Sequence, residues 1–497
     1  MNNNIRQSPN GAFAQNLVEV ATMGVYEAIN LIQTLDPLGR IPQVGYPKLQ
    51  PVLPRLCVTL DTDDLAETQG EDAQARDWLV AMGKGSNNGE TRPCIDLLVT
   101  PARSNQGTEW FAQCGIATYD NERVPGPLKR FHGLSLHANW EKMRLPDEPT
   151  APIIDVKVHL ALGRHLFVTR NQSLLNFALI PHPERNVFVL KPTEARWYVS
   201  LFLKAHGKYH PKTNYTIKRS IYYWQRLWHL VPTFQQAWPY TVYGEEDLPA
   251  GNHIADHMQS LYARLIGQMQ ACDRIGWLRY SVPTSDGRDE MLNQLNYFFM
   301  LATGVFDSLA WIALHRFGLR AGRQNVTLRE ERPIGQANPF FALLDLAAPP
   351  LASFLRGRQQ QAKIALFYDP RDTIQHRLVL TGAHYNSGQI ISDCNIAYLS
   401  RHDAQAIYAV DQMIPENMPF SKWGLMQFPE KPEKVILEPY RFTCTALRFF
   451  FPFVDEILRL LDFSAWVGVR PNIKAEADIT IAIARSRNGV SFDVPYP

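Results

Sequence analysis

The chain has 497 residues, with 50 Lys and Arg against 48 Asp and Glu, and a formal net charge of +2. This balance excludes a protein that is basic throughout, such as a nucleic-acid coat, but it leaves room for a local basic surface. Because a single hydrophobic core stops growing at about 250–300 residues, the length predicts two or three domains. A hydrophobic content of 45% is typical of globular proteins and excludes a disordered chain.

Residues 1–205 are predicted to form a β-rich N-terminal region of one or two subdomains. Short apolar or β-branched runs bounded by turn residues indicate strands at 56–60, 95–99 and 114–119. A helix is expected over 14–33. Beyond residue 150 we expect further strands in the runs IIDVKVHLAL, RHLFVTR, NVFVLK and RWYVSLFL.

Residues 206–415 are predicted to form an all-α bundle, because the hydrophobic period becomes helical after about residue 214. Amphipathic helices are expected at 215–230, 253–272, 290–317, 339–354 and 403–412. Asn338-Pro339 and Asp369-Pro370 each predict a helix start, since an N-cap residue precedes a proline at the first helical position.

Residues 416–497 are predicted to contain a Pro-rich connector, an amphipathic helix near 441–463 and strands at 479–483 and 490–494. We expect these strands to pack on the N-terminal sheet. The predicted fold class is therefore α+β and multidomain: a β-rich N-terminal region, a central helical bundle, and a C-terminal helix with short strands.

The sequence predicts a cytoplasmic protein that makes no membrane contact. The N-terminal residues lack the apolar segment of a secretory signal, and the most apolar stretch, 449–466, carries several charges. Six cysteines without a CxxC pair indicate reduced thiols rather than a disulfide framework or a zinc ribbon.

The segment YDPRDTIQHR, residues 368–377, contains the candidate catalytic group Arg371, Asp372 and His376. On a helix Asp372 and His376 would be i,i+4 neighbours, so the carboxylate could orient the imidazole. Two other Arg–His pairs of similar spacing, 130–137 and 377–384, contain glycines and are poor helix formers. The helical setting therefore singles out the pair Arg371 and His376.

This motif resembles the signature of HEPN-domain proteins, in which an Arg and a polar residue precede a His within a small helical bundle. The resemblance covers roughly residues 206–415, and its specific part is about six residues long. It implies a metal-independent endoribonuclease that needs neither a metal nor another cofactor. It also implies a homodimer in which two copies complete one active site.

Carried over to this chain, His376 would be the general acid or base, Arg371 the phosphate clamp and Asp372 the orienting residue. A His can remove the proton of a ribose 2′-OH or protonate the leaving 5′-oxygen. An Arg stabilises the charge that develops on the phosphorus group. Proteins of this build often act as toxins or abortive-infection effectors in antiviral defence. The N-terminal region would then be a sensor that responds to a phage-derived trigger.

An acid-free stretch from Arg196 to Gly244 predicts a local RNA-binding surface. Basic residues alternate there with tyrosines and tryptophans, a pattern that suits single-stranded RNA, although aromatic residues at helical spacing also suit a core. The candidate RNA contacts are Lys208, Lys212, Lys218, Arg219, Arg226 and, beside the motif, Arg377.

Several other groups have open interpretations. A second basic run, from Arg316 to Arg332, could lie beside the motif. Asp307 could support the site from a facing helix, close the dimer contact or simply touch solvent. His253 and His257 have zinc-ligand spacing but lack an evident third ligand, so a solvated helix face is favoured. Asp61, Asp63 and Asp64 could hold Mg²⁺, although a turn is favoured.

Two alternatives to a HEPN ribonuclease therefore stay open. The helical bundle could be a non-catalytic module for dimerisation or for nucleotide or RNA binding. The chain could instead be a metal-dependent nuclease that uses the Asp61–Asp64 group. The sequence does not identify the RNA target, the trigger or the ligand of residues 1–205.

Overall fold

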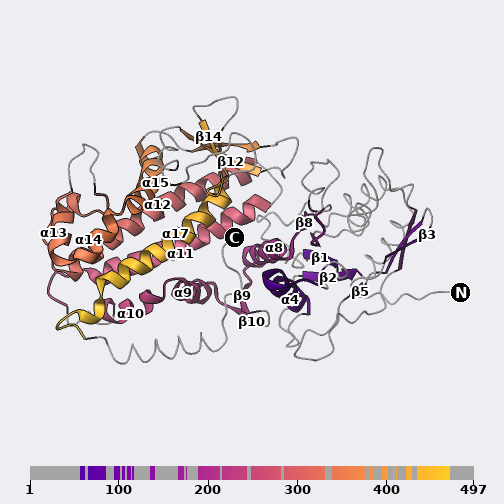
Figure 1. Cartoon of the computed structure of the whole chain (residues 1–497), viewed down its shortest axis with the longest axis horizontal. Helices are drawn as coiled ribbons and strands as arrows, with labels where there is room; N and C mark the ends of the chain where they lie inside the picture. The colour runs from indigo at the N-terminus through magenta and orange to yellow at the C-terminus, as the bar shows by residue number, and fades with distance from the viewer. Residues whose placement is uncertain are drawn as a thin grey trace, which may run out of the picture. The chain divides into compact units, whose positions relative to one another are not determined.

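The computed structural model divides the chain into two compact units, which are described separately below (Figure 1). The first consists of Met1–His206 with Thr213–Tyr215 and Asn386–Asp393, and the second contains the rest of the chain. The residues that the structure describes are 56–61, 65, 67–84, 95–100, 103–106, 109–113, 115–116, 135–139, 166–172, 175, 188–212, 215–242, 248–280, 285–330, 338–376, 380–385, 394–400, 407, 410, 421–427 and 434–470.

A five-stranded sheet in the order β5-β2-β1-β7-β8 forms the centre of the first unit. Its strands are β1 (Leu56–Asp61), β2 (Ile95–Thr100), β5 (Gly115–Ile116), β7 (Leu166–Val168) and β8 (Phe188–Leu190). All neighbouring pairs are parallel except β2 and β5. Because helix α4 (Gly70–Lys84) connects two parallel strands, β1 and β2, this part of the unit is an α/β arrangement.

The run RWYVSLFL is a helix, so the strand predicted there is wrong. It lies in α8 (Pro192–Ala205), in which Pro192 occupies the first turn and the Glu194 carboxylate accepts a hydrogen bond from the Lys191 backbone N–H at 3.0 Å. A short, fully buried apolar run has no period that separates helix from strand. The Pro and Glu at the start of this segment are typical of a helix N-terminus and indicate the helix.

A second, antiparallel sheet in this unit has the order β3-β4-β6. Its strands are β3 (Arg103–Gln106), β4 (Glu109–Gln113) and β6 (Ser135–Asn139). The helix predicted over 14–33 and the strand predicted in IIDVKVHLAL lie outside the described residues.

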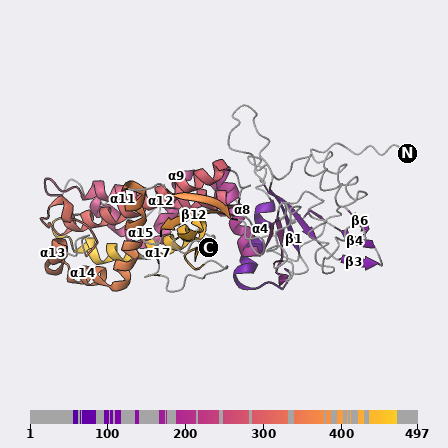
Figure 2. The same cartoon turned by 90° about the horizontal axis from the view of Figure 1, so that it is seen from above.

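Long helices dominate the second unit, and Figures 1 and 2 show them packed side by side. They are α9 (Arg219–Leu230), α10 (Pro232–Thr241), α11 (Ile254–Tyr280), α12 (Ser285–Arg316), α13 (Pro339–Ala347), α14 (Pro349–Arg356), α15 (Arg358–His376) and α17 (Pro439–Leu461), with the short 3-10 turns η2 (Arg323–Asn325) and η3 (Phe463–Ala465). A hairpin of β9 (Tyr209–Lys212) and β10 (Tyr215–Ile217) precedes α9, where a single helix over 215–230 was predicted. The predicted helix 339–354 is divided between α13 and α14 at Ala348.

Helix α12 is the central helix of this unit and packs against α11, α15 and α17. Phe306 on α12 contacts Phe367 of α15 at 6.0 Å and Phe450 and Phe453 of α17 at 5.3 and 5.6 Å between ring centroids. By length and composition α12 could cross a membrane, but 78% of its apolar window is buried inside the protein. Burial of that kind is typical of the core helix of a globular bundle.

A four-stranded antiparallel sheet, in the order β11-β12-β14-β13, joins the C-terminal region to the second unit. Its strands are β11 (Thr381–Tyr385), β12 (Cys394–Ser400), β13 (Leu425–Gln427) and β14 (Lys434–Leu437). Because α17 packs on α10, α11 and α12, residues 421–470 belong to the same unit as these helices. The predicted strands at 479–483 and 490–494 lie outside the described residues.

The two predicted Pro-containing helix starts have different outcomes. Asn338 caps α13 as predicted, because its side chain accepts a hydrogen bond from Phe340 N at 3.0 Å and Pro339 follows it. Asp369 and Pro370 instead lie inside α15, so the predicted start there is wrong. The residues upstream, RQQQAKIALF, are mostly strong helix formers and extend the helix back to Arg358.

Candidate functional site

The motif residues lie near the C-terminal end of α15 rather than in a first helical turn. Arg371 and Asp372 are partly exposed, and Arg371 Nη1 donates to Asp372 Oδ1 at 2.7 Å. His376 is the last residue of α15 and follows Asp372 by four positions on the same helix. This end of a helix favours positive charge, so it suits Arg371 better than the predicted start would have done.

Arg329, from the second basic run, joins this group although it lies far from the motif in the sequence. Its Nη1 atom is 3.9 Å from Asp372 Oδ2, and its guanidinium lies 4.8 Å from the centre of the Tyr368 ring. Two arginines therefore converge on one carboxylate, Asp372. Paired guanidinium groups are well suited to a phosphate, which accepts bidentate hydrogen bonds.

Asp307 of α12 contacts the motif helix α15, as expected if it supports the site from a facing helix. The Tyr368 hydroxyl donates to Asp307 Oδ1 at 2.9 Å. Asp307 is accessible to solvent, yet the surrounding protein desolvates its carboxyl and so raises its pKa. The hydrogen bond from Tyr368 and the charges of Arg371 and Arg264 lower this pKa, but desolvation is the larger effect. Burial and the nearby Asp307 also raise the pKa of Tyr368, which keeps its proton.

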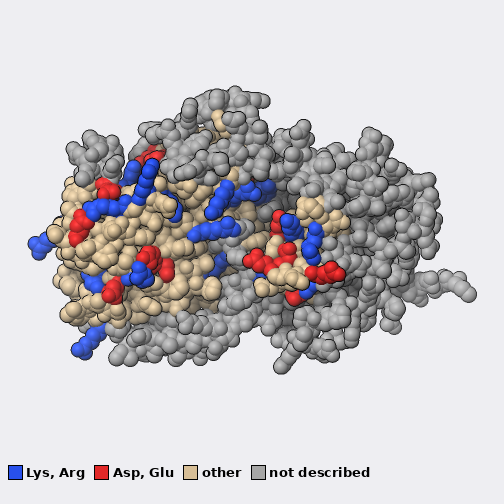
Figure 3. Space-filling view, viewed as in Figure 1, with Lys and Arg blue, Asp and Glu red and all other residues tan. Residues whose placement is uncertain are grey.

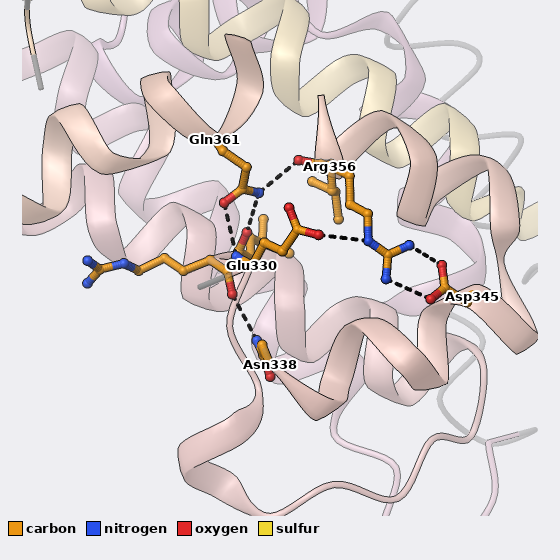
Figure 4. Close-up of polar contacts among 8 residues, drawn as sticks. Glu330, Asn338, Asp345, Arg356 and Gln361 are labelled. Atoms are coloured by element: carbon orange, nitrogen blue, oxygen red, sulfur yellow. Dashed lines mark hydrogen bonds and ion pairs between the residues drawn. The ribbon is translucent and has the colours of Figure 1, made fainter. Parts of the chain in front are cut away.

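The loop that carries Arg329 is held by side chains from three helices (Figure 4). Gln361 of α15 accepts from Glu330 N at 3.0 Å and donates to Leu328 O and Leu355 O. Arg356 of α14 donates to Glu330 Oε1 at 2.9 Å and also pairs with Asp345 of α13. The Asn338 amide donates to the carbonyls on either side of Leu328, those of Thr327 and Arg329, at 3.2 and 2.9 Å. The backbone at Arg329 is thus fixed before any ligand binds.

Replacing Asn338 with alanine is expected to lower the free energy of unfolding by about 1–2 kcal/mol. The change removes the cap of α13 and leaves two backbone carbonyls without their donor. Urea denaturation at pH 7 measures the loss. Asn338→Asp is the matched control, because it keeps the cap acceptor but lacks the amide donors. Equal stability of wild type and both variants would show that this amide does not hold the loop.

The predicted RNA contacts differ in their exposure to solvent. Lys218 and Arg219 are exposed at the start of α9, and Lys208 is partly exposed. Arg226 is only 2% exposed and donates to the Tyr222 hydroxyl at 3.0 Å, so its prediction as a surface contact is wrong. The side chain of Lys212 and the whole of Arg377 lie outside the described residues.

The aromatic part of the same stretch is largely core. Tyr222, Tyr223 and Trp228 are buried, and the Tyr223 hydroxyl donates to the buried Asp273 at 2.8 Å. Positive charge is not confined to this stretch, since Lys422, Arg441 and Arg448 are exposed near and on α17. Figure 3 shows groups of Lys and Arg on the helical unit, some of which have no Asp or Glu next to them among the residues drawn in colour.

His253 and His257 on α11 do not form a zinc site with any third ligand in the described part of the chain, where no group of three potential ligands could hold a metal ion. His253 is exposed and lies 3.4 Å from Asp256. His257 is only partly exposed and packs on Trp311 and His315 of α12, with centroid distances of 5.4 Å to each. The expected solvated face is therefore correct for His253 but not for His257.

The stability of the second unit is expected to fall as the pH is lowered from about 6.5 to about 4. Desolvation and the neighbouring His257 and His253 lower the pKa of His315 from 6.5 to about 4. As the pH falls, His315 therefore takes up a proton in the unfolded chain before it does so in the folded protein. Proton uptake favours the unfolded state, so the free energy of unfolding is highest above pH 6.5 and decreases toward pH 4. Urea midpoints across this range measure it, and His315→Asn should show a smaller decrease. Identical pH profiles would contradict the shift.

Two members of the site were missed from the sequence. The sequence predicts no role for Tyr368, which lies within the motif, or for Arg264, which lies in the predicted helix 253–272. No local signal marks either residue, because their partners lie on other helices. Of the acidic group considered for Mg²⁺, Asp61 is the last residue of β1, and Asp63 and Asp64 lie outside the described residues.

No protein-family model, curated protein or solved structure matches this chain significantly.

Proposed function

We propose that the chain is a metal-independent endoribonuclease of HEPN type. The observation that carries the proposal is the convergence of Arg371 and Arg329 on Asp372, at 2.7 and 3.9 Å, one helical turn before His376 on α15. Two cations that can bind a phosphate thus lie one helical turn from a histidine in the sequence of α15, and histidine can act as a general acid or base.

In the proposed reaction the ribose 2′-oxygen attacks the adjacent phosphorus and loses its proton to a base. The bond from phosphorus to the 5′-oxygen breaks, and that oxygen takes up a proton from an acid. His376 fills one of these roles, and Arg371 and Arg329 stabilise the extra negative charge on the phosphorus group. The products are a 2′,3′-cyclic phosphate and a 5′-hydroxyl. Asp372 and Tyr368 position the two arginines.

The biological setting of this proposal comes from the motif resemblance. The chain would be a defence effector or toxin that acts as a homodimer with a composite site. The first unit would keep it silent until a phage-derived trigger binds. A non-catalytic module for dimerisation or for nucleotide or RNA binding is the alternative, and it would bind RNA without cutting it.

A second candidate function is metal-dependent phosphodiester chemistry in the first unit, and the strand order of its sheet favours it. Parallel strands β2 and β7 lie on opposite sides of β1, and the order reverses between β1 and β7. In open α/β sheets ligands bind beyond the carboxyl ends of the strands at such a point. Asp61 ends β1 there, at the edge where a cation-bound phosphate would be expected.

Cleavage of a single-stranded oligoribonucleotide by the full chain, in EDTA and in Mg²⁺, separates these functions. The HEPN-type proposal predicts cutting in EDTA, cyclic-phosphate ends and no cutting of the DNA strand of the same sequence, which lacks the 2′-OH. Cutting only with Mg²⁺ would favour the first unit instead. Binding without cutting under both conditions would favour the non-catalytic module.

A further inference from the structure

Three near-parallel rings form a cluster between α11 and α12. His257 stacks on Trp311 at 5.4 Å with 10° between the ring planes, and on His315 at 5.4 Å with 24°. Trp311 and His315 are 6.0 Å apart at 30°. All three side chains are partly exposed, in contrast to the fully buried phenylalanines of the core. Aromatic surface of this kind is left accessible rather than used only for packing.

This ring cluster adjoins the candidate site along α12. Asp307, Trp311 and His315 follow one another at intervals of four residues, so they lie on one face of the helix, about 6 Å apart per step. Asp307 is the residue that accepts the hydrogen bond from Tyr368. The cluster therefore begins about one helical turn from the group that holds Arg329 and Arg371.

Arg264 of α11 connects the two groups from the other side. Its guanidinium packs against Gly304 of α12. Any larger residue at position 304 would clash with it, because a Cβ atom added there would lie only 2.0 Å from Arg264 Nη1. Its charge acts both on Asp307 and on His257. Gly304 thus leaves room for a third cation about one helical turn before Asp307 on α12.

The ring cluster is uncharged at neutral pH. Desolvation lowers the pKa of His257, and it lowers that of His315 to about 4. His253 lies 6.0 Å from His315 at 79°, and Asp256 and Arg264 are the other charged groups acting on His257. The rings consequently suit a flat neutral group, whereas the phosphate charge belongs to the arginines.

We propose that Trp311, His257 and His315 form a stacking platform for an unpaired nucleobase of the RNA whose phosphate binds at Arg371 and Arg329. The proposal rests on the proposed ribonuclease function and identifies the substrate as single-stranded RNA. Neighbouring cations and exposed aromatic faces are the combination by which proteins bind single strands, since every base has a π-face.

Fluorescence titration with a single-stranded oligoribonucleotide that carries 2-aminopurine, whose emission is quenched by stacking, tests the platform. Trp311→Ala is expected to weaken binding about 5- to 150-fold and to remove the quenching. Trp311→Phe should retain most of both. The salt dependence of binding should stay unchanged in Trp311→Ala but become shallower in Arg329→Ala, since only the latter loses a phosphate contact.

Trp277→Ala is the control for the loss of a tryptophan away from the platform, because Trp277 lies 20 residues after His257 on α11, about 30 Å along the helix axis. If circular dichroism shows that Trp311→Ala is unfolded, His315→Ala replaces it, with a smaller loss expected. The platform is overturned if Trp311→Ala binds like wild type or if Trp311→Phe binds as weakly as Trp311→Ala. If RNA binding depends on Trp311 but the RNA is not cut, only the ribonuclease function is overturned. If the RNA is cut and its binding does not depend on Trp311, only the platform is overturned.

Discussion

Replacement of Arg371 with alanine is expected to lower the rate of RNA cleavage by about a hundredfold to a thousandfold. The guanidinium is one of two positive groups that converge on Asp372, and loss of one such donor to a developing phosphorane has effects of this size. Single-turnover cleavage of an oligoribonucleotide measures the change. Arg371→Lys should recover only part of the rate, since an ammonium group cannot bind a phosphate in bidentate fashion.

Arg358→Ala is the matched control for this prediction. Arg358 is an exposed arginine at the start of the same helix, far from Asp372, so its removal changes the net charge equally without touching the site. If both variants lose activity equally, the loss reflects overall charge. If neither loses activity, Arg371 is not the phosphate clamp.

Phe306→Ala is expected to lower the free energy of unfolding of the second unit by about 3–5 kcal/mol. The ring is fully buried at the junction of α12, α15 and α17, and its removal leaves a cavity that the surrounding phenylalanines cannot fill. Phe306 also stacks on Tyr368 at 6.0 Å, so cleavage should fall as well. Urea denaturation followed by far-UV circular dichroism measures the stability change.

Phe317→Ala provides the comparison for Phe306, because Phe317 is only partly buried just beyond the end of α12. Its removal leaves less cavity and should cost clearly less. Similar losses for the two variants would show that the aromatic cluster around Phe306 is not what holds α12, α15 and α17 together.

The helices of the second unit could be predicted because their hydrophobic period repeats over many residues. Their boundaries depended on context, as the two Pro-containing starts show. Asn338 caps α13, whereas the equivalent pair Asp369-Pro370 is overridden by the helix-forming residues from Arg358 onward. A capping signal marks a permitted start, and the upstream residues decide whether it is used.

The candidate site could be predicted only where its residues are local. Arg371 and Asp372 were identified because they are adjacent on one helix. Arg329 is recognisable in the sequence only as part of a basic run. Nothing in the sequence indicates that its guanidinium packs on the Tyr368 ring. The contact between Asp307 and Tyr368 joins residues 61 positions apart. Such pairings depend on how α12 packs on α15, which local patterns do not determine.

Cleavage of single-stranded RNA in EDTA by wild type and by His376→Ala tests the proposed ribonuclease function most directly. We predict that wild type cuts without metal and that the variant, folded as judged by circular dichroism, is slower by about a hundredfold to ten-thousandfold, since general acid–base catalysis contributes this much. His229→Ala, which changes an exposed histidine on α9, should cut like wild type. Equal rates for wild type and His376→Ala, or no cutting by wild type in EDTA, would show that the chain is not a HEPN-type ribonuclease.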